Sequence, residues 1–317
     1  MQMNAISRKS AVVAIALLVA ILSAAVLRYW FAPFNMELAD NPTHDKVWLV
    51  VIAVLLYFGN AFLQGKMLMR AGLSASQNTL PLPVYGLLAC GVFVAPDMIE
   101  TSVASLCFAF SLYLLLRSLH NLEETDSVFF ASILLGAMVL FYPPCVILAL
   151  VIPIAIFALG LSLRQSLLMI VGYVIPFFAT SYVVWYRGGA FFDVGSKICS
   201  GIATSQMAAI EQVPYVAISF VALVAVLLIW GVVPAAIRPV KILMLMRVRR
   251  ALYFFLFVAL AAMAILLMPA CDLSACAIIA VPLTVLLCFV LYILPGGLST
   301  IAYWVLLVLF VVHLFVA

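Results

Sequence analysis

Long apolar runs, separated by short polar segments, make up almost the whole chain. A helix that crosses a hydrocarbon layer of roughly 30 Å needs about 20 apolar residues, because only helices and closed barrels satisfy every backbone amide there. The runs are continuous and lack the alternation of a barrel strand. The pattern therefore predicts an all-α, polytopic membrane protein with about 11 transmembrane helices. We expect these helices at residues 11–29, 47–64, 79–96, 101–117, 127–142, 144–161, 166–186, 214–236, 251–269, 276–294 and 298–316.

The predicted helix at 127–142 is the shortest, and its length leaves open whether it spans the membrane fully. The sequence FYPPC ends it, because adjacent prolines cannot continue a helix. The two halves of the chain share neither loop lengths nor charge pattern, so no inverted repeat is indicated. We therefore expect a single transmembrane domain over residues 1–317, with residues 214–317 as its C-terminal helices.

Composition supports the membrane class, since 69% of the residues are apolar and only 8% are charged. So few charges do not keep the surface of a soluble protein of this length hydrated. The phosphate-binding motif GxxxxGK[ST] is absent, and nothing resembles a soluble catalytic domain. We expect membrane lipids as neighbours and no nucleic-acid partner.

The basic residues predict the orientation, because short loops rich in Lys and Arg stay on the cytoplasmic side. With a cytoplasmic N-terminus, 11 of the 15 basic residues fall in inner segments. Eight of the 11 acidic residues then fall on the outer side, and the odd number of spans places the C-terminus there as well. Chemistry that needs carboxylates is therefore expected at the outer face.

Three outer segments carry the candidate chemistry: the loops at 30–46 and 97–101 and the longest loop, at 187–213. The third is apolar enough to lie partly in the membrane interface. The acidic side chains of the first two are Glu37, Asp40, Asp45, Asp97 and Glu100.

No ionisable side chain lies at the middle of a predicted span. Such residues mark ion paths and proton relays, so ion-coupled or proton-coupled transport is disfavoured. The seven cysteines have no histidine partner for a metal site, and we expect neither a metal nor a cofactor. Cys271 and Cys276, in the outer sequence CDLSAC, either form a disulfide or remain two packing thiols.

The stretches GAMVLFYPP and LRQSLLMIVGYVIPF follow a helix and a short charged inner loop. With the acidic outer loops, this layout resembles the GT-C class of polytopic glycosyltransferases over residues 1–190. The resemblance implies that a sugar is transferred from a polyprenyl-phosphate donor at the outer face of the bacterial inner membrane. It implies catalysis by Glu37 or Asp40, helped by Asp97 or Glu100. The basic residues that offset the charge of the departing lipid phosphate are then Arg28, Lys46, Arg187 and Lys197.

Other features favour different functions. The first outer loop has no Asp directly after the first helix, and it is short for the amphipathic helices of GT-C enzymes. The chain also resembles an uncharacterised family of bacterial inner-membrane proteins of similar length. The acids are then ordinary solvated loop residues, and the protein is a non-catalytic subunit or scaffold of a cell-surface assembly or secretion complex. Small-residue faces such as VALAAMAILL would pack against the partner. A lipid or lipid-linked-sugar flippase is a third alternative, disfavoured by the absence of charges within the bundle.

Overall fold

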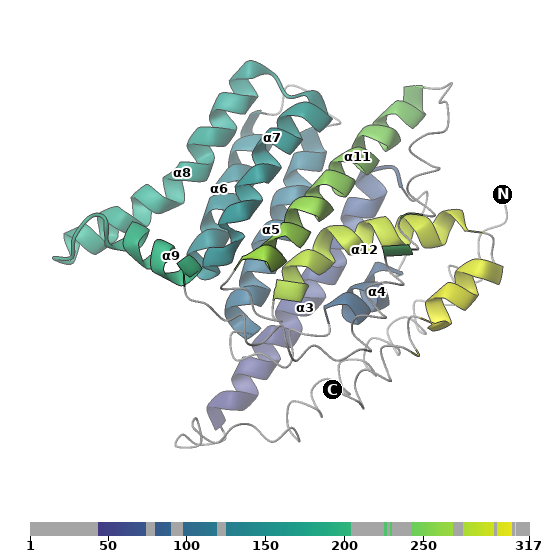
Figure 1. Ribbon diagram of the computed structural model, residues 1–317, viewed down its shortest axis with the longest axis horizontal. Coiled ribbons are helices and arrows are strands. Elements are labelled where there is room, and N and C mark those ends of the chain that lie inside the picture. The colour runs from purple at the N-terminus through teal and green to yellow at the C-terminus, as the bar shows by residue number, and fades with distance from the viewer. Residues whose placement is uncertain are drawn as a thin grey trace.

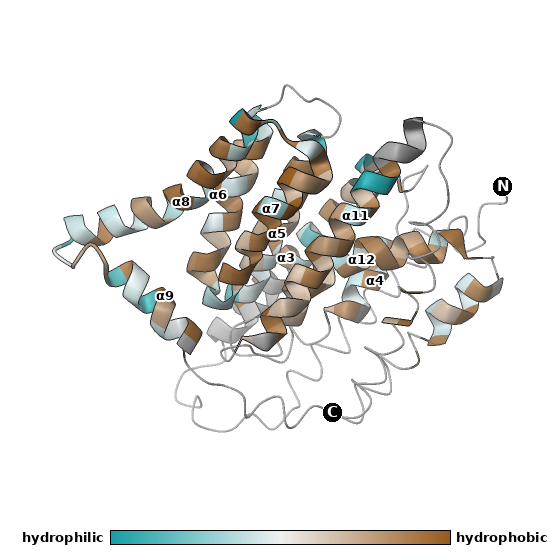
Figure 2. Cartoon of the chain, turned by 45° about the horizontal axis from the view of Figure 1, so that its top comes forward, coloured by the Kyte–Doolittle hydropathy of each residue, from teal (hydrophilic) through white to brown (hydrophobic). Residues whose placement is uncertain are grey.

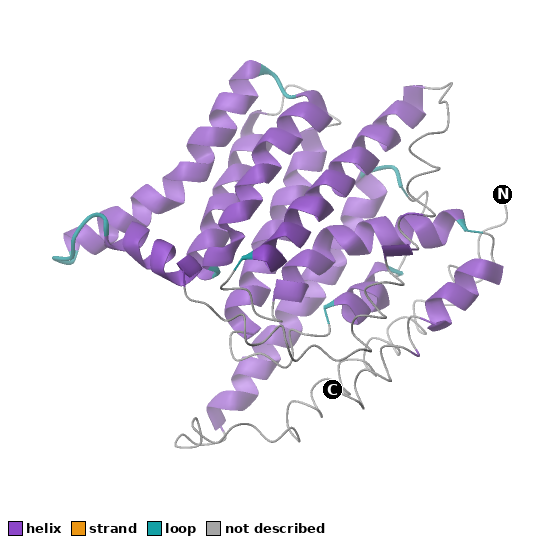
Figure 3. Ribbon diagram, in the orientation of Figure 1, coloured by secondary structure: helices purple, strands orange, loops and turns teal. Residues whose placement is uncertain are grey.

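The computed structural model describes residues 44–73, 80–89, 98–118, 125–203, 225–226, 229, 243–268, 275–294, 297–305 and 308. Within these residues every regular element is a helix (Figure 3). The longer helices pack side by side as a bundle (Figure 1). The predicted all-helical fold is confirmed for the described part of the chain.

Five helical stretches are long and apolar enough to cross a membrane. α6 (Thr125–Phe141) is apolar and 17 residues long, and α3 (His44–Arg70) has 27 residues. These helices fit the predicted multi-pass membrane protein. The five stretches lie in α5 (Met98–Ser118), residues 143–160, α8 (Leu163–Tyr186), α11 (Leu243–Met263) with η6 (Ala264–Leu267), and α12 (Cys276–Ile293).

Most predicted spans coincide with these helices to within a few residues. α6, for example, ends at Phe141 and the next helix begins at Pro143, as the proline pair predicts. The predicted span 11–29, most of 214–236 and part of 298–316 lie outside the described residues. The number of eleven spans and the orientation of the two termini stay predictions.

One predicted span takes a different form. Where a helix was expected over 79–96, the described residues contain α4 (Pro81–Leu88), which is 8 residues long and has Ala89 as its C-cap. A helix of this length measures about 12 Å, less than half the hydrocarbon thickness. It nevertheless lies inside the bundle, since Val84 and Tyr85 are buried and α12 and α3 are its neighbours. The predicted length was wrong because hydropathy measures apolarity and does not show where a helix stops.

The stretch 143–160 is helical throughout but changes its hydrogen-bonding pattern twice. It begins as a 3-10 helix, η3 (Pro143–Leu150), continues as α7 (Val151–Ala155) and ends as a π-helix, η4 (Ile156–Gly160). Pro153 has no N–H, so a regular α-helical ladder cannot run through this segment. Gly160 ends it with a φ of 70°, a conformation that glycine adopts without strain.

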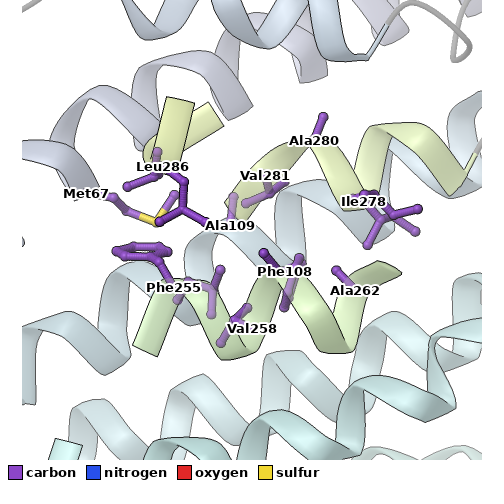
Figure 4. Close-up of a cluster of buried hydrophobic side chains, with 14 of the residues drawn as sticks. Met67, Phe108, Ala109, Phe255, Val258, Ala262, Ile278, Ala280, Val281 and Leu286 are labelled. Atoms are coloured by element: carbon purple, nitrogen blue, oxygen red, sulfur yellow. The ribbon is translucent and has the colours of Figure 1, made fainter. Parts of the chain in front are cut away.

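α12 is the most deeply buried of the five stretches that are long enough to cross a membrane. Its sequence is apolar around the whole circumference, and nearly all residues from 277 to 291 are buried. It contacts α3, α4, α5 and α11. Figure 4 shows the core of this contact, where Met67 of α3, Phe108 of α5, Phe255 of α11 and Leu286 of α12 gather.

α6 and α8 approach each other most closely at two glycines. A Cβ atom on Gly136 would overlap the carbonyl oxygen of Tyr173, and one on Gly172 would overlap the hydroxyl of Ser132. The same Cβ on Gly172 would lie 2.9 Å from the carbonyl oxygen of Phe129. Small residues let two membrane helices pack backbone to backbone, so these glycines fix the crossing of α6 and α8.

Basic side chains gather at one end of the bundle, which we call the basic end. α3 and α5 end there and α8 begins there, and hydrophilic colours concentrate at helix ends and on the segment after α8 (Figure 2). The turn at Gly72 lies against Val248 at this end. The other end, which we call the opposite end, holds the start of α5 and the end of α8. The basic residues at the basic end whose side chains the structure describes are Lys66, Arg70, Arg117, Arg164, Arg249 and Arg250.

Replacing Gly172 with alanine is expected to destabilise the bundle, because the new methyl group overlaps Ser132 and the backbone of α6. Overpacking of this kind typically costs about 1–3 kcal/mol. Thermal unfolding of the purified protein in detergent measures the effect. Gly195→Ala is the matched control, since nothing lies within 4 Å of its Cβ position. Equal stability of the two variants would contradict the close crossing.

The predicted orientation is testable through Cys199, which is exposed at the opposite end. In a variant that keeps only this cysteine, a membrane-impermeant maleimide should label intact cells, because the positive-inside rule places the basic end in the cytoplasm. In a cysteine-free background, Arg164→Cys at the start of α8 should be labelled only after lysis. Labelling of Arg164→Cys in intact cells would reverse the orientation.

Candidate functional site

The predicted catalytic carboxylates fall only partly within the described residues. Glu37, Asp40 and Asp97 lie outside them. Glu100 lies in the first turn of α5 at the opposite end, where its side chain is exposed. Among the described residues no hydrogen bond or ion pair engages it. Glu100 is therefore available to accept a proton, while convergence with the other three acids stays a prediction.

Of the predicted phosphate-binding residues, too, some lie within the described part of the chain and others lie outside it. Arg28 lies outside the described residues, and Lys46 lies in the first turn of α3 with a side chain that is also outside them. Arg187 is the C-cap of α8 and Lys197 lies in α9 (Asp193–Ala203), and both are exposed at the opposite end. In the described part of the chain neither forms an ion pair with Glu100. The structure thus brings Glu100, Arg187 and Lys197 to one end without joining them.

The second half of α8 and α9 form an arm at the opposite end, which we call the α8–α9 arm (residues 177–203). The first half of α8 packs on α6, and beyond Pro176 the helix diverges from it (Figure 1). The hydroxyl of Thr180 donates to the carbonyl oxygens of Pro176 and Phe177 at 2.8 and 3.1 Å, a contact typical of bent helices. Exposed aromatic residues of the arm are Phe178, Tyr182, Trp185, Tyr186 and Phe192.

A hydrogen-bonded network lies inside the bundle, where α3, α4, α5 and α12 meet. The hydroxyl of Tyr57 donates to the carbonyl oxygen of Leu82 at 3.4 Å, and its ring centroid lies 5.0 Å from that of Tyr85. The hydroxyls of Tyr85 and Ser105 lie 3.1 Å apart. Ser105 donates to the carbonyl oxygen of Ala277 at 3.0 Å. Buried hydroxyls therefore tie the short helix α4 to its three neighbours.

Two side-chain amides continue this polar region along α3. Asn60 and Gln64 are one helical turn apart and are 1% and 0% exposed. Their four amide atoms have no hydrogen-bond partner among the described residues. Both lie on the face of α3 that carries Tyr57 and Met67, which is the face turned to the core (Figure 4). At 1.5 Å per residue they stand about 9–15 Å from Arg70, within the hydrocarbon layer.

Tyr57, Asn60, Gln64, Tyr85 and Ser105 together form what we call the interior polar cluster. Each free amide offers one acceptor oxygen and two donor hydrogens, which suit hydroxyl groups, water or another amide better than an ion. The described residues contain no group of three His, Cys, Asp or Glu side chains arranged to hold a metal ion. The cluster can therefore hydrogen-bond an uncharged polar group within the membrane.

The sequence prediction missed the interior polar cluster because it considered only ionisable residues within the spans. The available signal was the spacing of Asn60 and Gln64, four residues apart in an otherwise apolar run. A buried amide without a partner costs about 1–3 kcal/mol, so two amides that find none among the described residues mark this helical face as a candidate binding surface.

Cys276 is the first residue of α12, and Cys271 lies outside the described residues. The choice between a disulfide and two packing thiols therefore stays open.

The chain matches none of the protein-family models, curated proteins or solved structures with which it was compared.

Replacing the two amides with apolar residues of similar shape, as in Asn60→Leu and Gln64→Met, is expected to stabilise the fold. Removing an unpaired buried amide recovers its desolvation cost, about 1–3 kcal/mol for each residue. Thermal unfolding in detergent measures the change.

Ser105→Ala provides a control of opposite sign, because it removes the hydrogen bond to the carbonyl oxygen of Ala277. We expect it to lower stability by about 0.5–1.5 kcal/mol. A comparable loss in Asn60→Leu and Gln64→Met would show that the two amides have partners in the folded protein.

Proposed function

We propose that the protein transfers a sugar from a polyprenyl-phosphate donor at the outer face of the bacterial inner membrane, with Glu100 as the general base. The observation that carries the proposal is the exposed carboxylate of Glu100, which has no partner among the described residues. A general base must be free to take a proton from its substrate. Arg187 and Lys197 lie at the same end of the bundle, where a lipid phosphate needs a cation.

The proposed reaction is a displacement at the anomeric carbon of the sugar. The acceptor hydroxyl attacks this carbon, and Glu100 takes the hydroxyl proton. The bond between the anomeric carbon and the phosphate oxygen breaks, and its electron pair leaves with the polyprenyl phosphate. Arg187 and Lys197 stabilise the negative charge on this leaving group. The glycosylated acceptor and the lipid phosphate are the products.

The α8–α9 arm supports this assignment through its surface. Trp185, Tyr186 and Phe192 are exposed beside the cations, and aromatic side chains favour the membrane interface. An isoprenoid chain is apolar and remains in the bilayer while its phosphate lies at the headgroup level. The arm therefore offers an apolar surface and a cationic group at the same depth. The resemblance of residues 1–190 to GT-C enzymes supports the same reaction.

A second function, a non-catalytic subunit of a membrane complex, is favoured by one observation. Tyr182, Val183, Trp185 and Tyr186 are all exposed, and at about 100° per residue they occupy nearly half of the circumference of α8. A helix of a partner protein would cover this surface by packing against it. The acids and bases at the opposite end would then be solvated surface residues.

The transferase proposal predicts that Glu100→Gln inserts and folds normally but loses activity by about two orders of magnitude or more, as expected for a general base. The assay is complementation of a deletion strain, scored by polyprenyl-linked sugar that accumulates and surface glycan that is lost. Asp126→Asn is the matched control, because Asp126 is also exposed in the first turn of a helix, at the basic end.

Glu37→Gln, Asp40→Asn and Asp97→Asn belong in the same series, since these acids are the other predicted catalytic residues. Full activity of all four variants would exclude a carboxylate base. A deletion strain with an unchanged glycan profile, in which the protein co-purifies in fixed ratio with another membrane protein, would favour the non-catalytic subunit.

A further inference from the structure

The line along which α3 and α5 meet at the basic end, which we call the groove, has the composition of a lipid-binding site. The two helices run parallel. Gly59 of α3 lies against Leu106 of α5, and further along both helices Arg70 lies against Tyr113. Residues that follow Gly59 at helical spacing on α3 therefore face the same groove as Tyr113 of α5. Lys66 is one of them, since it lies one turn before Arg70.

Arg70 is the central group of this groove. Its guanidinium carbon lies 4.4 Å from the ring centroid of Tyr113, a cation–π contact that holds the side chain in place. One of its terminal nitrogens, Nη1, is buried and has no hydrogen-bond partner among the described residues. Arginine keeps its charge under all ordinary conditions, so this nitrogen needs an acceptor oxygen. An oxyanion is the ligand that supplies it best.

Lys66 adds a second positive charge one turn away. It is exposed, and its ammonium nitrogen lies 4.5 Å from the ring centroid of Phe62. Arg70 has no ion pair with any acidic residue in the part of the chain that the structure describes. Asp126 is the one described acid at the basic end, and its carboxylate accepts a hydrogen bond from Thr125 at 3.5 Å. Within the described residues no acid therefore neutralises either cation, and Lys66 is exposed while the Arg70 side chain is partly exposed around its buried Nη1.

Apolar side chains extend from these cations towards the membrane centre. Phe62 precedes Arg70 by two turns and is 59% exposed, and Phe110 is 41% exposed. The ring of Phe110 stacks on that of Tyr113 with 6.1 Å between the centroids. The groove thus presents cations at the level of the lipid headgroups and aromatic surface at the level of the acyl chains.

We propose that the groove between α3 and α5 binds an anionic phospholipid, with its phosphate on Arg70 and Lys66 and an acyl chain along Phe62 and Phe110. The cations complement the charge of a phosphate, and the exposed side chains of Phe62 and Phe110 can contact an acyl chain. A free phosphate would make only the first of these contacts, so both features together favour a lipid. The site lies at the end remote from Glu100, Arg187 and Lys197, so it is independent of the transferase proposal.

The test is native mass spectrometry of the full chain in detergent, titrated with phosphatidylglycerol and with phosphatidylcholine. The wild-type protein should bind phosphatidylglycerol at least fivefold more tightly. Lys66→Gln and Arg70→Gln should each weaken phosphatidylglycerol binding by about fivefold, as each basic residue near an anionic lipid contributes about that factor. They should weaken phosphatidylcholine binding less, because its choline group offsets the charge of the phosphate. Arg164→Gln is the control, because Arg164 is exposed at the same end but lies on α8.

Equal affinity of the wild-type protein for the two lipids would overturn the proposal, and so would an equal loss in Arg164→Gln and Arg70→Gln. If Arg70→Gln does not fold, Lys66→Gln and Arg70→Lys serve as the test of phosphatidylglycerol binding. Arg70→Lys keeps the charge but loses the planar donor group, so a loss of a few-fold supports the site and wild-type affinity in both variants refutes it. Displacement of phosphatidylglycerol by millimolar inorganic phosphate would show that the groove binds phosphate itself.

Discussion

The enclosure of α12 is the constraint on which the rest of the bundle depends. Lipid solvates an apolar helix as well as neighbouring helices do, so the burial of α12 follows from close packing and from hydrogen bonds between helices, and its apolar sequence alone does not require it. α3, α4, α5 and α11 provide the surrounding layer. The carbonyl oxygen of Ala277, near its start, accepts hydrogen bonds from Ser105 and Tyr85 and thereby aligns α12 with the polar region of its neighbours.

Hydropathy and proline positions predicted the helices well where the chain obeys local rules. The end of α6 before Pro143 follows from the absent N–H of proline, which any sequence displays directly. The end of α4 at Leu88 was not predictable in this way, because the following residues are as apolar as the helix itself.

In the candidate site, too, some features were predictable from the sequence and others became visible only in the fold. The placement of Glu100 and Lys197 at one end followed from counting spans, as both belong to segments predicted to join spans on the same side of the membrane. The interior polar cluster did not follow, since Tyr57, Tyr85 and Ser105 come from three helices that only the fold brings together. A sequence pattern shows residues that share a helix face, and it does not show which faces meet.

Charged side chains have different surroundings at the two ends of the protein. At the basic end, Arg70 and Arg249 rest on tyrosine rings, which hold each guanidinium close to the protein and spare it full hydration. At the opposite end, Glu100, Arg187 and Lys197 extend into solvent without such support. The first arrangement suits lasting occupancy by a lipid, whereas the second suits groups that must exchange protons and release products.

The mixed helix at 143–160 has a consequence for how the protein matches its bilayer. A regular α-helix of 18 residues measures about 27 Å, which is shorter than a hydrocarbon layer of roughly 30 Å. A 3-10 helix rises about 2.0 Å per residue, so the 8 residues of η3 gain about 4 Å over the α-helical length, and the 5 residues of the wider π-helix η4 reduce that gain in part. The prolines that prevent a regular helix thus stretch a short segment to nearly the thickness that it must cross, without thinning the membrane around it.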